Sequence, residues 1–289
     1  MATHTRFARN FTPDLRRLKS WPSMKGSLWR QPYLIELTYA KNFQLVKESI
    51  PGKKLKILEV GCGTGFMSLE LARMGHYVTA IDRNKDLVSL AKRTASTDPY
   101  RKTRGGLTFD IANFDRWTGR PEAYDIVLFS RVLHDMPQPE RILSKARVQL
   151  KEFGRIICLE YAYNLLDRRA ATWLFQIRRI LEVAGWTQLP HLPEKPHVGV
   201  NKIMRENSER KQHINSYNEM RKPLVKLFDE ELLSWHPYHY WDILANMRIP
   251  DKRQQKSFAA LLRSIEEFLI RSGEIQPVLF RFVGTKTRR

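Results

Sequence analysis

Residues 58–65 constrain the fold of this chain more than any other stretch of its sequence. An apolar run that ends at Val60 is typical of a buried strand, and Gly61, Gly63 and Gly65 then alternate with other residues before a helical pattern begins. Glycines allow a sharp turn and let a ligand lie against backbone N–H groups. Phe66 stands where a dinucleotide-binding turn would carry its third glycine, so that class of site is not indicated.

Strand and helix patterns alternate on either side of this turn. Apolar runs of strand length occur at 56–60, 77–82, 107–110, 125–130 and 154–160. Apolar residues recur at helical spacing over 33–50, 66–74, 87–93, 140–150 and 168–184. Such alternation predicts an α/β protein with a doubly wound, mostly parallel sheet.

The pattern changes after the fifth predicted strand. Residues 186–250 are rich in proline and have no clear period, whereas 252–272 predict a long helix and 277–284 a closing strand. Because an unstructured stretch of that length is rare inside a compact domain, we expect an inserted helical cap. The predicted organisation is a basic segment over 1–33, a core over 34–185, a cap over 186–250, and 251–289 completing the core.

Three acidic residues are expected at the ends of three successive strands: Glu59, Asp82 and Asp110. The carboxyl ends of parallel strands meet at one edge of the sheet, where open α/β folds bind ligands. Glu59 suits cationic or hydroxyl groups, Asp82 can accept from two ribose hydroxyls, and Asp110 can accept from an exocyclic amine. Together with the glycine turn, they predict a pocket for a nucleoside.

Taken in order, these motifs resemble the class I S-adenosylmethionine-dependent methyltransferases. The resemblance covers residues 34–185 and the closing strand, and it implies a seven-stranded, Rossmann-like methyltransferase sheet. It implies S-adenosylmethionine as the methyl donor and S-adenosylhomocysteine as the product. The cofactor-binding residues that it implies are Glu59, Gly61, Cys62, Gly63 and Gly65 for the methionine part, Asp82 for the ribose, Arg83, Asp110 and Ile111 for the adenine, and Ser130 and Arg131 beside the sulfonium.

The stretch 124–136 resembles the small-molecule branch of that family, which includes ubiquinone- and sterol-type enzymes. That branch often carries Val-Leu-His-His where this chain has Val-Leu-His-Asp, with Asp135 in the last position. The motifs that mark methylation of nucleobase amines or of cytosine carbon do not follow the fourth strand.

Four residues are candidates for catalysis. An in-line methyl transfer needs alignment of its reactants, and a hydroxyl or ammonium acceptor must also give a proton to a base. His134 is the predicted base, oriented by Asp135, and a role in the pocket wall is the alternative. Glu160 and Tyr161 end the fifth strand and are expected to face the acceptor, although Glu160 could equally cap the next helix.

The aromatic segment 235–241 is interpreted first as the core of the cap and second as a contact for an apolar acceptor. His236 and His239 could chelate a metal ion together with Asp242, but no further ligand is obvious, so no metal site is predicted.

The chain carries 50 Lys and Arg against 30 Asp and Glu, a formal net charge of +20 concentrated in residues 1–55 and 161–289. Such a charge attracts polyanions, so a nucleic acid is an alternative partner beside a small-molecule or peptide acceptor. The chain has two cysteines, no secretory pattern and no apolar run of membrane-spanning length, which favours a cytoplasmic protein.

The leading hypothesis is a methyltransferase that uses S-adenosylmethionine to methylate O, N or C of a small molecule or peptide. The first alternative is an RNA-directed methyltransferase that docks through its basic flanks. The second is an inactive, methyltransferase-like binding protein, against which the intact turn and acids argue.

Overall fold

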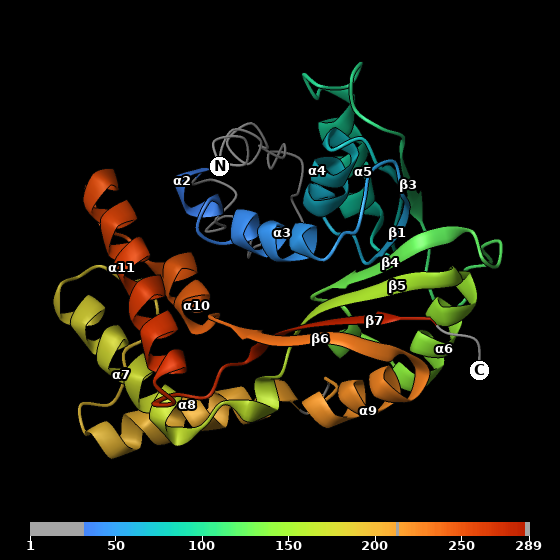
Figure 1. Ribbon diagram of the computed structural model, residues 1–289. Helices are drawn as coiled ribbons and strands as arrows, with labels where there is room; N and C mark the ends of the chain where they lie inside the picture. Colours follow the sequence, from blue (N-terminus) through green and yellow to red (C-terminus); the bar gives the residue numbers. More distant parts are fainter. Residues whose placement is uncertain (1–31, 212–213, 287–289) are drawn as a thin grey trace.

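The computed structural model describes residues 32–211 and 214–286, so most of the predicted basic segment 1–33 lies outside the described residues. Within those two ranges, seven strands form one sheet in the order β3-β2-β1-β4-β5-β7-β6 (Figure 1). The strands are β1 Lys56–Val60, β2 Tyr77–Asp82, β3 Leu107–Ile111, β4 Tyr124–Ser130, β5 Leu150–Tyr161, β6 Asp229–His236 and β7 Leu279–Thr285. β7 runs antiparallel to both of its neighbours, β5 and β6, and the other pairs among these strands are parallel, so the predicted mostly parallel, seven-stranded fold is confirmed.

Side chains along the central strands alternate between two hydrophobic layers. Ile126 and Leu128 of β4 pack into the layer that contains α3 (Tyr39–Glu48), α4 (Phe66–Arg73) and α5 (Lys85–Ser96). Val127 and Phe129 face the opposite layer, which contains α6 (Pro139–Gln149) and α9 (Tyr217–Leu227). The alternation follows from the two-residue period of a strand, and burial on both faces explains why this strand is apolar throughout.

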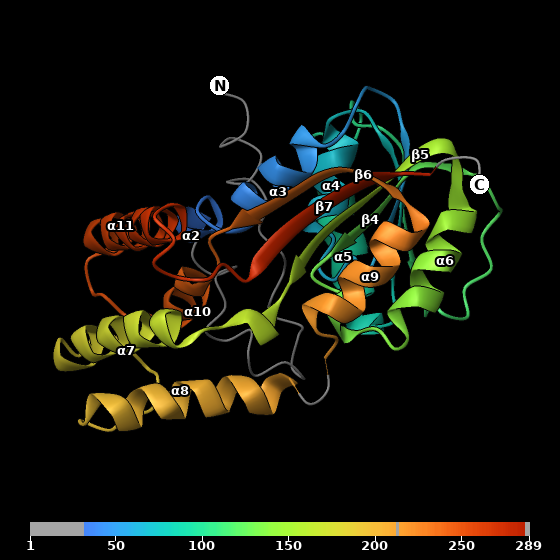
Figure 2. The same ribbon diagram turned by 60° about the horizontal axis from the view of Figure 1, so that its bottom comes forward.

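A group of helices extends beyond one end of the sheet (Figures 1 and 2). It consists of α7 (Arg168–Val183), α8 (Pro196–Lys211), α10 (His239–Asn246) and α11 (Lys252–Arg271), with the short α2 (Pro32–Ile35) beside α11. Their buried apolar residues join the layer of α3 and α4, so the group shares its core with the sheet. In the described ranges, no helix has the length and apolar character needed to cross a membrane.

The predicted cap over 186–250 is wrong in its boundaries. β6 lies inside that range and pairs with β7, from Asp229 opposite Thr285 to His236 opposite Leu279. α9, which precedes β6, packs against α6 of the core. β6 escaped detection because it is an edge strand: its first half is exposed and charged, so no apolar run marks it.

The predicted helix over 33–50 is two helices, α2 and α3. The chain turns at residues 36–38, where Thr38 Oγ1 donates to the carbonyl oxygen of Leu34 at 2.9 Å. A threonine that bonds its own backbone in this way competes with helical hydrogen bonding. The turn matters for the site because it directs Tyr39, the first residue of α3, toward the cavity described below.

Candidate active site

The turn between β1 and α4 is shaped by glycines with positive φ. Gly61 has φ +74°, and a Cβ there would lie 2.3 Å from Val132 Cγ2, so only glycine fits. Gly63 has φ +52°, and a Cβ there would meet no atom within 4 Å. Because Gly63 lines a cavity, its missing side chain leaves room for a ligand against the backbone.

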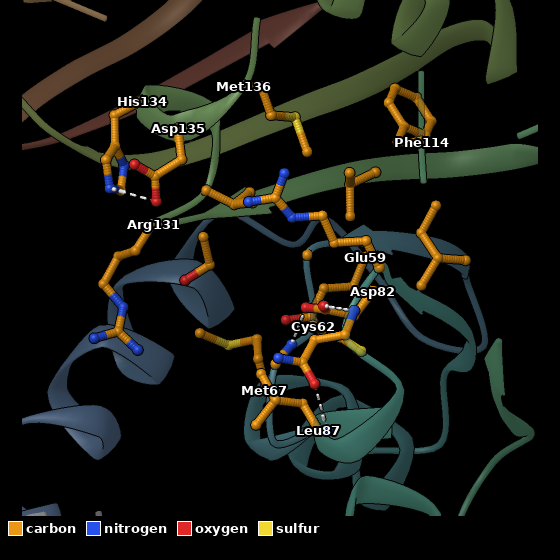
Figure 3. Close-up of a pocket in the computed structure, with 18 of the residues that line it drawn as sticks. Glu59, Cys62, Met67, Asp82, Leu87, Phe114, Arg131, His134, Asp135 and Met136 are labelled. Atoms are coloured by element: carbon orange, nitrogen blue, oxygen red, sulfur yellow. Dashed lines mark hydrogen bonds and ion pairs between the residues drawn. The ribbon is translucent and has the colours of Figure 1, made fainter. Parts of the chain in front are cut away.

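That cavity has a volume of about 700 Å³ and lies at the carboxyl ends of β1, β2 and β4. Most of the predicted site residues line it: Glu59, Gly61, Cys62, Gly63, Asp82, Arg83, Ser130, Arg131, His134, Asp135 and Tyr161. Figure 3 shows His134 and Asp135 on one side of the cavity and Glu59, Cys62 and Asp82 on the other. The sequence therefore located one shared site, although the ligand contacts of these residues stay a prediction.

The Asp82 carboxylate is held in place by the glycine turn. Gly63 N donates to Oδ2 and Asn84 N donates to Oδ1, both at 2.8 Å. Asp82 is half-buried at the end of β2, with both oxygens turned toward the loops that border the cavity. These hydrogen bonds fix the position of the Asp82 carboxylate relative to the glycine turn.

Glu59 is 2% exposed and accepts a hydrogen bond from Ser68 Oγ of α4. Burial, with a smaller contribution from the nearby charge of Asp82, raises the pKa of Glu59 to about 8. A cationic neighbour lowers a carboxyl pKa that burial has raised, and so stabilises the carboxylate anion. Glu59 therefore suits a cavity ligand that carries an ammonium group.

Three predicted cofactor residues lie away from the cavity. Gly65 caps the start of α4, where a Cβ would lie 2.8 Å from Ala91 Cβ, so its role is in packing. Asp110 is exposed within β3, and Ile111 is 52% exposed. β3 continues one residue beyond its predicted end, and the residues that reach the cavity are the following ones, Ala112, Asn113 and Phe114. Asp110 and Ile111 therefore do not line this cavity, and the adenine contacts predicted for them stay a prediction.

His134 is buried in a short 3-10 helix, η4 (Leu133–Asp135), that follows β4. Its Nδ1 lies 2.8 Å from Glu160 Oε2, and its Nε2 lies 3.5 Å from Asp135 Oδ2. Burial lowers the pKa of His134, but the hydrogen bond to Glu160 and the charges of Glu160 and Asp135 outweigh this effect, so its pKa is raised. Because a carboxylate only accepts, Nδ1 is the donor and Nε2 carries the lone pair of the neutral ring.

Glu160 does not line the cavity, contrary to the prediction that it faces the acceptor. Its Oε1 accepts from the backbone N–H groups of Val132 and Leu133, each at 2.8 Å, while Oε2 bonds His134. Glu160 is fully buried, so these three bonds fix both the loop after β4 and the imidazole ring. The orienting role assigned to Asp135 thus belongs to Glu160, and Asp135 is an exposed neighbour of the other nitrogen.

An aromatic wall beside His134 was only partly anticipated. Tyr39, Tyr238 and Trp241 line the cavity with Tyr161, whose ring centroid lies 5.4 Å from that of His134 and 4.1 Å from that of Tyr238. The aromatic segment 235–241 is therefore divided, because Tyr240 is buried in the core while Tyr238 and Trp241 also reach the cavity. The sequence of this segment does not show which of its aromatic residues face the core and which face the cavity.

The two histidines of that segment have other contacts. His236 Nε2 lies 2.9 Å from Ser234 Oγ, and His239 Nε2 faces the carbonyl oxygen of Gln276 at 3.4 Å. No set of three His, Cys, Asp or Glu side chains that could hold a metal ion occurs in the part of the chain that the structure describes.

Comparisons with known proteins agree with this geometry. A family model described as a methyltransferase domain matches residues 51–217, more than half of the chain. The chain is 32% identical over 133 residues to the mitochondrial ubiquinone biosynthesis O-methyltransferase of Schizosaccharomyces pombe, covering 46% of this chain and 47% of that protein. It is 30% identical over 143 residues to the ubiquinone biosynthesis O-methyltransferase of Hydrogenovibrio crunogenus, covering 50% and 53%. The matched region thus spans about half the length of these relatives.

Among solved structures, the geranyl diphosphate C-methyltransferase of Streptomyces coelicolor A3(2) has a TM-score of 0.56 with this chain at 12% identity. The superposition covers 90% of this chain and 81% of that one. At this identity the likeness shows a shared fold.

Proposed function

The chain belongs to the methyltransferase-domain family of class I S-adenosylmethionine-dependent enzymes, and we propose that it methylates a hydroxyl oxygen of a small molecule with His134 as the general base. One observation carries the proposal: Glu160 is buried and accepts three hydrogen bonds, and it holds His134 so that Nε2, 3.5 Å from Asp135 Oδ2, is the basic nitrogen. The names of the ubiquinone O-methyltransferases support an oxygen acceptor.

The donor set of the cavity fits S-adenosylmethionine. Gly63 leaves the space of a side chain open, and Glu59 is a buried carboxyl group that a cationic group would stabilise as the anion. We assign Glu59 to the ammonium of the methionine part, Asp82 to the ribose hydroxyls, and Asn113 and Phe114 to the side of the adenine. When bound there, the cofactor supplies an electrophilic methyl group on a sulfonium.

His134 acts on the acceptor. Its Nε2 takes the hydroxyl proton, while Nδ1–H stays bonded to Glu160, which stabilises the imidazolium that forms. Tyr161 and Tyr238 form the apolar wall beside the ring and exclude water from the acceptor oxygen. Alignment in the cavity and removal of the proton are the two contributions of the chain.

The first experiment identifies the acceptor. Purified protein is incubated with radiolabelled S-adenosylmethionine and a lysate, and the RNA, protein and small-molecule fractions are separated. Label in the small-molecule fraction is the expected result. Label confined to RNA or to protein contradicts a small-molecule acceptor.

The base is then tested on the labelled fraction with His134→Ala. We expect kcat to fall by roughly 10²–10⁴, while the calorimetric affinity for S-adenosylhomocysteine stays within about twofold, because His134 is assigned to the acceptor. An unaltered rate would remove His134 as the base.

The pH profile separates a base from a wall residue. The rate should rise with pH as His134 loses its proton, with an inflection above the ordinary histidine value of about 6.5. Glu160→Gln removes the charge that raises this pKa, so the inflection moves to lower pH and the plateau rate falls. Glu152→Gln, an exposed position on the same strand, should leave the profile unchanged.

A further inference from the structure

Arg131 has an unusual backbone for a residue other than glycine. It directly follows β4, has φ +59°, and donates its N–H to the carbonyl oxygen of Leu159 at 2.8 Å. The left-handed region strains such a residue, and residues held there cluster at functional sites. In Figure 3 its side chain extends away from Glu59 and Asp82, on the side of His134 and Asp135.

The guanidinium of Arg131 lies among aromatic side chains from three elements. Its central carbon is 4.6 Å from the ring centroid of Tyr39 on α3 and 4.8 Å from that of Trp241 on α10. Nη1 donates to the hydroxyl of Tyr161 on β5 at 3.4 Å. Aromatic rings around a guanidinium orient it and exclude water from it, but they carry no negative charge.

The charge of Arg131 is not matched by a carboxylate. Its Nε is buried without a hydrogen-bond partner, and no ion pair joins it to an acidic side chain among the described residues. Two other arginines that stack on rings do have such partners. Arg73, over Tyr100, binds Glu70 and Asp98 at 2.7 Å each, and Arg221, over Phe282, binds Glu230.

A half-buried cation without a counter-ion among the described residues is costly, and a cavity ligand with an anionic group would relieve that cost. We propose that Arg131 binds a carboxylate of the acceptor, so that the substrate carries both a hydroxyl for His134 and an anionic group for Arg131. The inference rests on the proposed function, because it names the substrate class of the same cavity. Tyr161 links the two positions, since it contacts both the His134 ring and the guanidinium.

The cofactor carries a carboxylate of its own, so the test has to separate two sources of the same chemistry. Calorimetry compares S-adenosylhomocysteine with 5′-methylthioadenosine, which lacks the amino-acid part, on the wild type and on Arg131→Met. If Arg131 serves the acceptor, the variant binds both nucleosides within about twofold of the wild type. A selective loss of S-adenosylhomocysteine affinity of about tenfold or more would assign Arg131 to the cofactor and overturn the proposal.

The anion site is tested in the protein saturated with S-adenosylhomocysteine. Phenylacetate and neutral phenylacetamide have nearly the same shape, and we expect phenylacetate to bind about tenfold tighter or more. Arg131→Met should abolish this preference, and Arg131→Lys should keep part of it. Arg221→Met is the matched control: that arginine also stacks on a ring but lies outside the cavity, so the preference should persist.

The outcomes are separable. A wild-type protein that binds S-adenosylhomocysteine but does not distinguish phenylacetate from phenylacetamide overturns the role of Arg131 alone. A wild-type protein that does not bind S-adenosylhomocysteine contradicts the proposed function itself. The wild-type comparison and Arg131→Lys keep the test decisive if Arg131→Met does not fold.

Discussion

At the scale of single residues, the carboxylates around the cavity differ in role because their hydrogen-bond partners differ. Glu160 accepts three bonds from its own chain, so it positions His134 and has little capacity left for a ligand. Asp82 accepts two backbone bonds and borders the cavity, and Glu59 accepts one from Ser68. The remaining lone pairs of Asp82 and Glu59 are therefore the ones that can meet a cofactor.

Asp82→Ala should weaken binding of S-adenosylhomocysteine by roughly 10- to 100-fold, because it removes charge-assisted bonds to the ligand and leaves Gly63 N without its acceptor. Asp110→Ala is the matched control, since Asp110 is exposed and lies off the cavity. Calorimetry on both variants checks the prediction. Equal affinities for Asp82→Ala and the wild type would contradict the pocket assignment, and a loss of affinity in Asp110→Ala would show that Asp110 contacts the ligand.

At the scale of elements, the aromatic wall depends on how α10 is attached. Glu266, fully buried on α11, accepts from the backbone N–H groups of Tyr238, His239 and Tyr240 at 2.6–2.8 Å. A carboxylate at this position satisfies the donors that begin a helix and complements its dipole. Glu266 thus holds the segment that brings Tyr238 and Trp241 to the cavity.

Glu266→Ala should lower the free energy of unfolding by at least about 2 kcal/mol, because buried N–H groups lose their acceptor. Glu267→Ala, one residue further on, removes only the half-exposed pairs with Arg263 and Arg271 and should cost less than about 1 kcal/mol. Urea denaturation of the two variants provides the comparison. A cost for Glu266→Ala no larger than that for Glu267→Ala would mean that α10 is held by its apolar contacts alone.

At the scale of the whole molecule, the net charge of +20 and the cavity at the sheet edge suggest different acceptors. An excess of positive charge attracts any polyanion and is insensitive to the chemistry of the site. A hydroxyl acceptor aligned in the cavity needs no contact with the outer surface. Salt distinguishes the two cases, because contacts with phosphates release counter-ions.

Methyl transfer to a small acceptor should change by less than about twofold in kcat/KM between about 50 and 200 mM KCl. An RNA acceptor bound through several phosphates would lose about 10³–10⁵ in affinity over the same range. Rates measured on the labelled fraction across a salt series test the difference. A steep fall of the rate with salt would indicate an acceptor bound through the basic surface and favour the RNA-directed alternative.

The sequence by itself determined where along the chain strands β1 to β5 lie and where the glycine turn between β1 and α4 lies. These features rest on local patterns: apolar runs bounded by turns, and glycines at positions where a side chain would collide or fill the cavity. Asp82 was located for the same reason, because the end of a buried strand can be recognised from neighbouring residues.

Only the tertiary structure decided which side chains share the acceptor side of the cavity. Glu160 bonds His134 across 26 residues of chain, and Arg131, just after β4, contacts Trp241 on α10. β6 was recognisable only through its pairing with β7, since an edge strand needs no apolar pattern of its own. Local patterns report burial and turns, whereas the direction of a side chain and its partners follow from how distant elements pack.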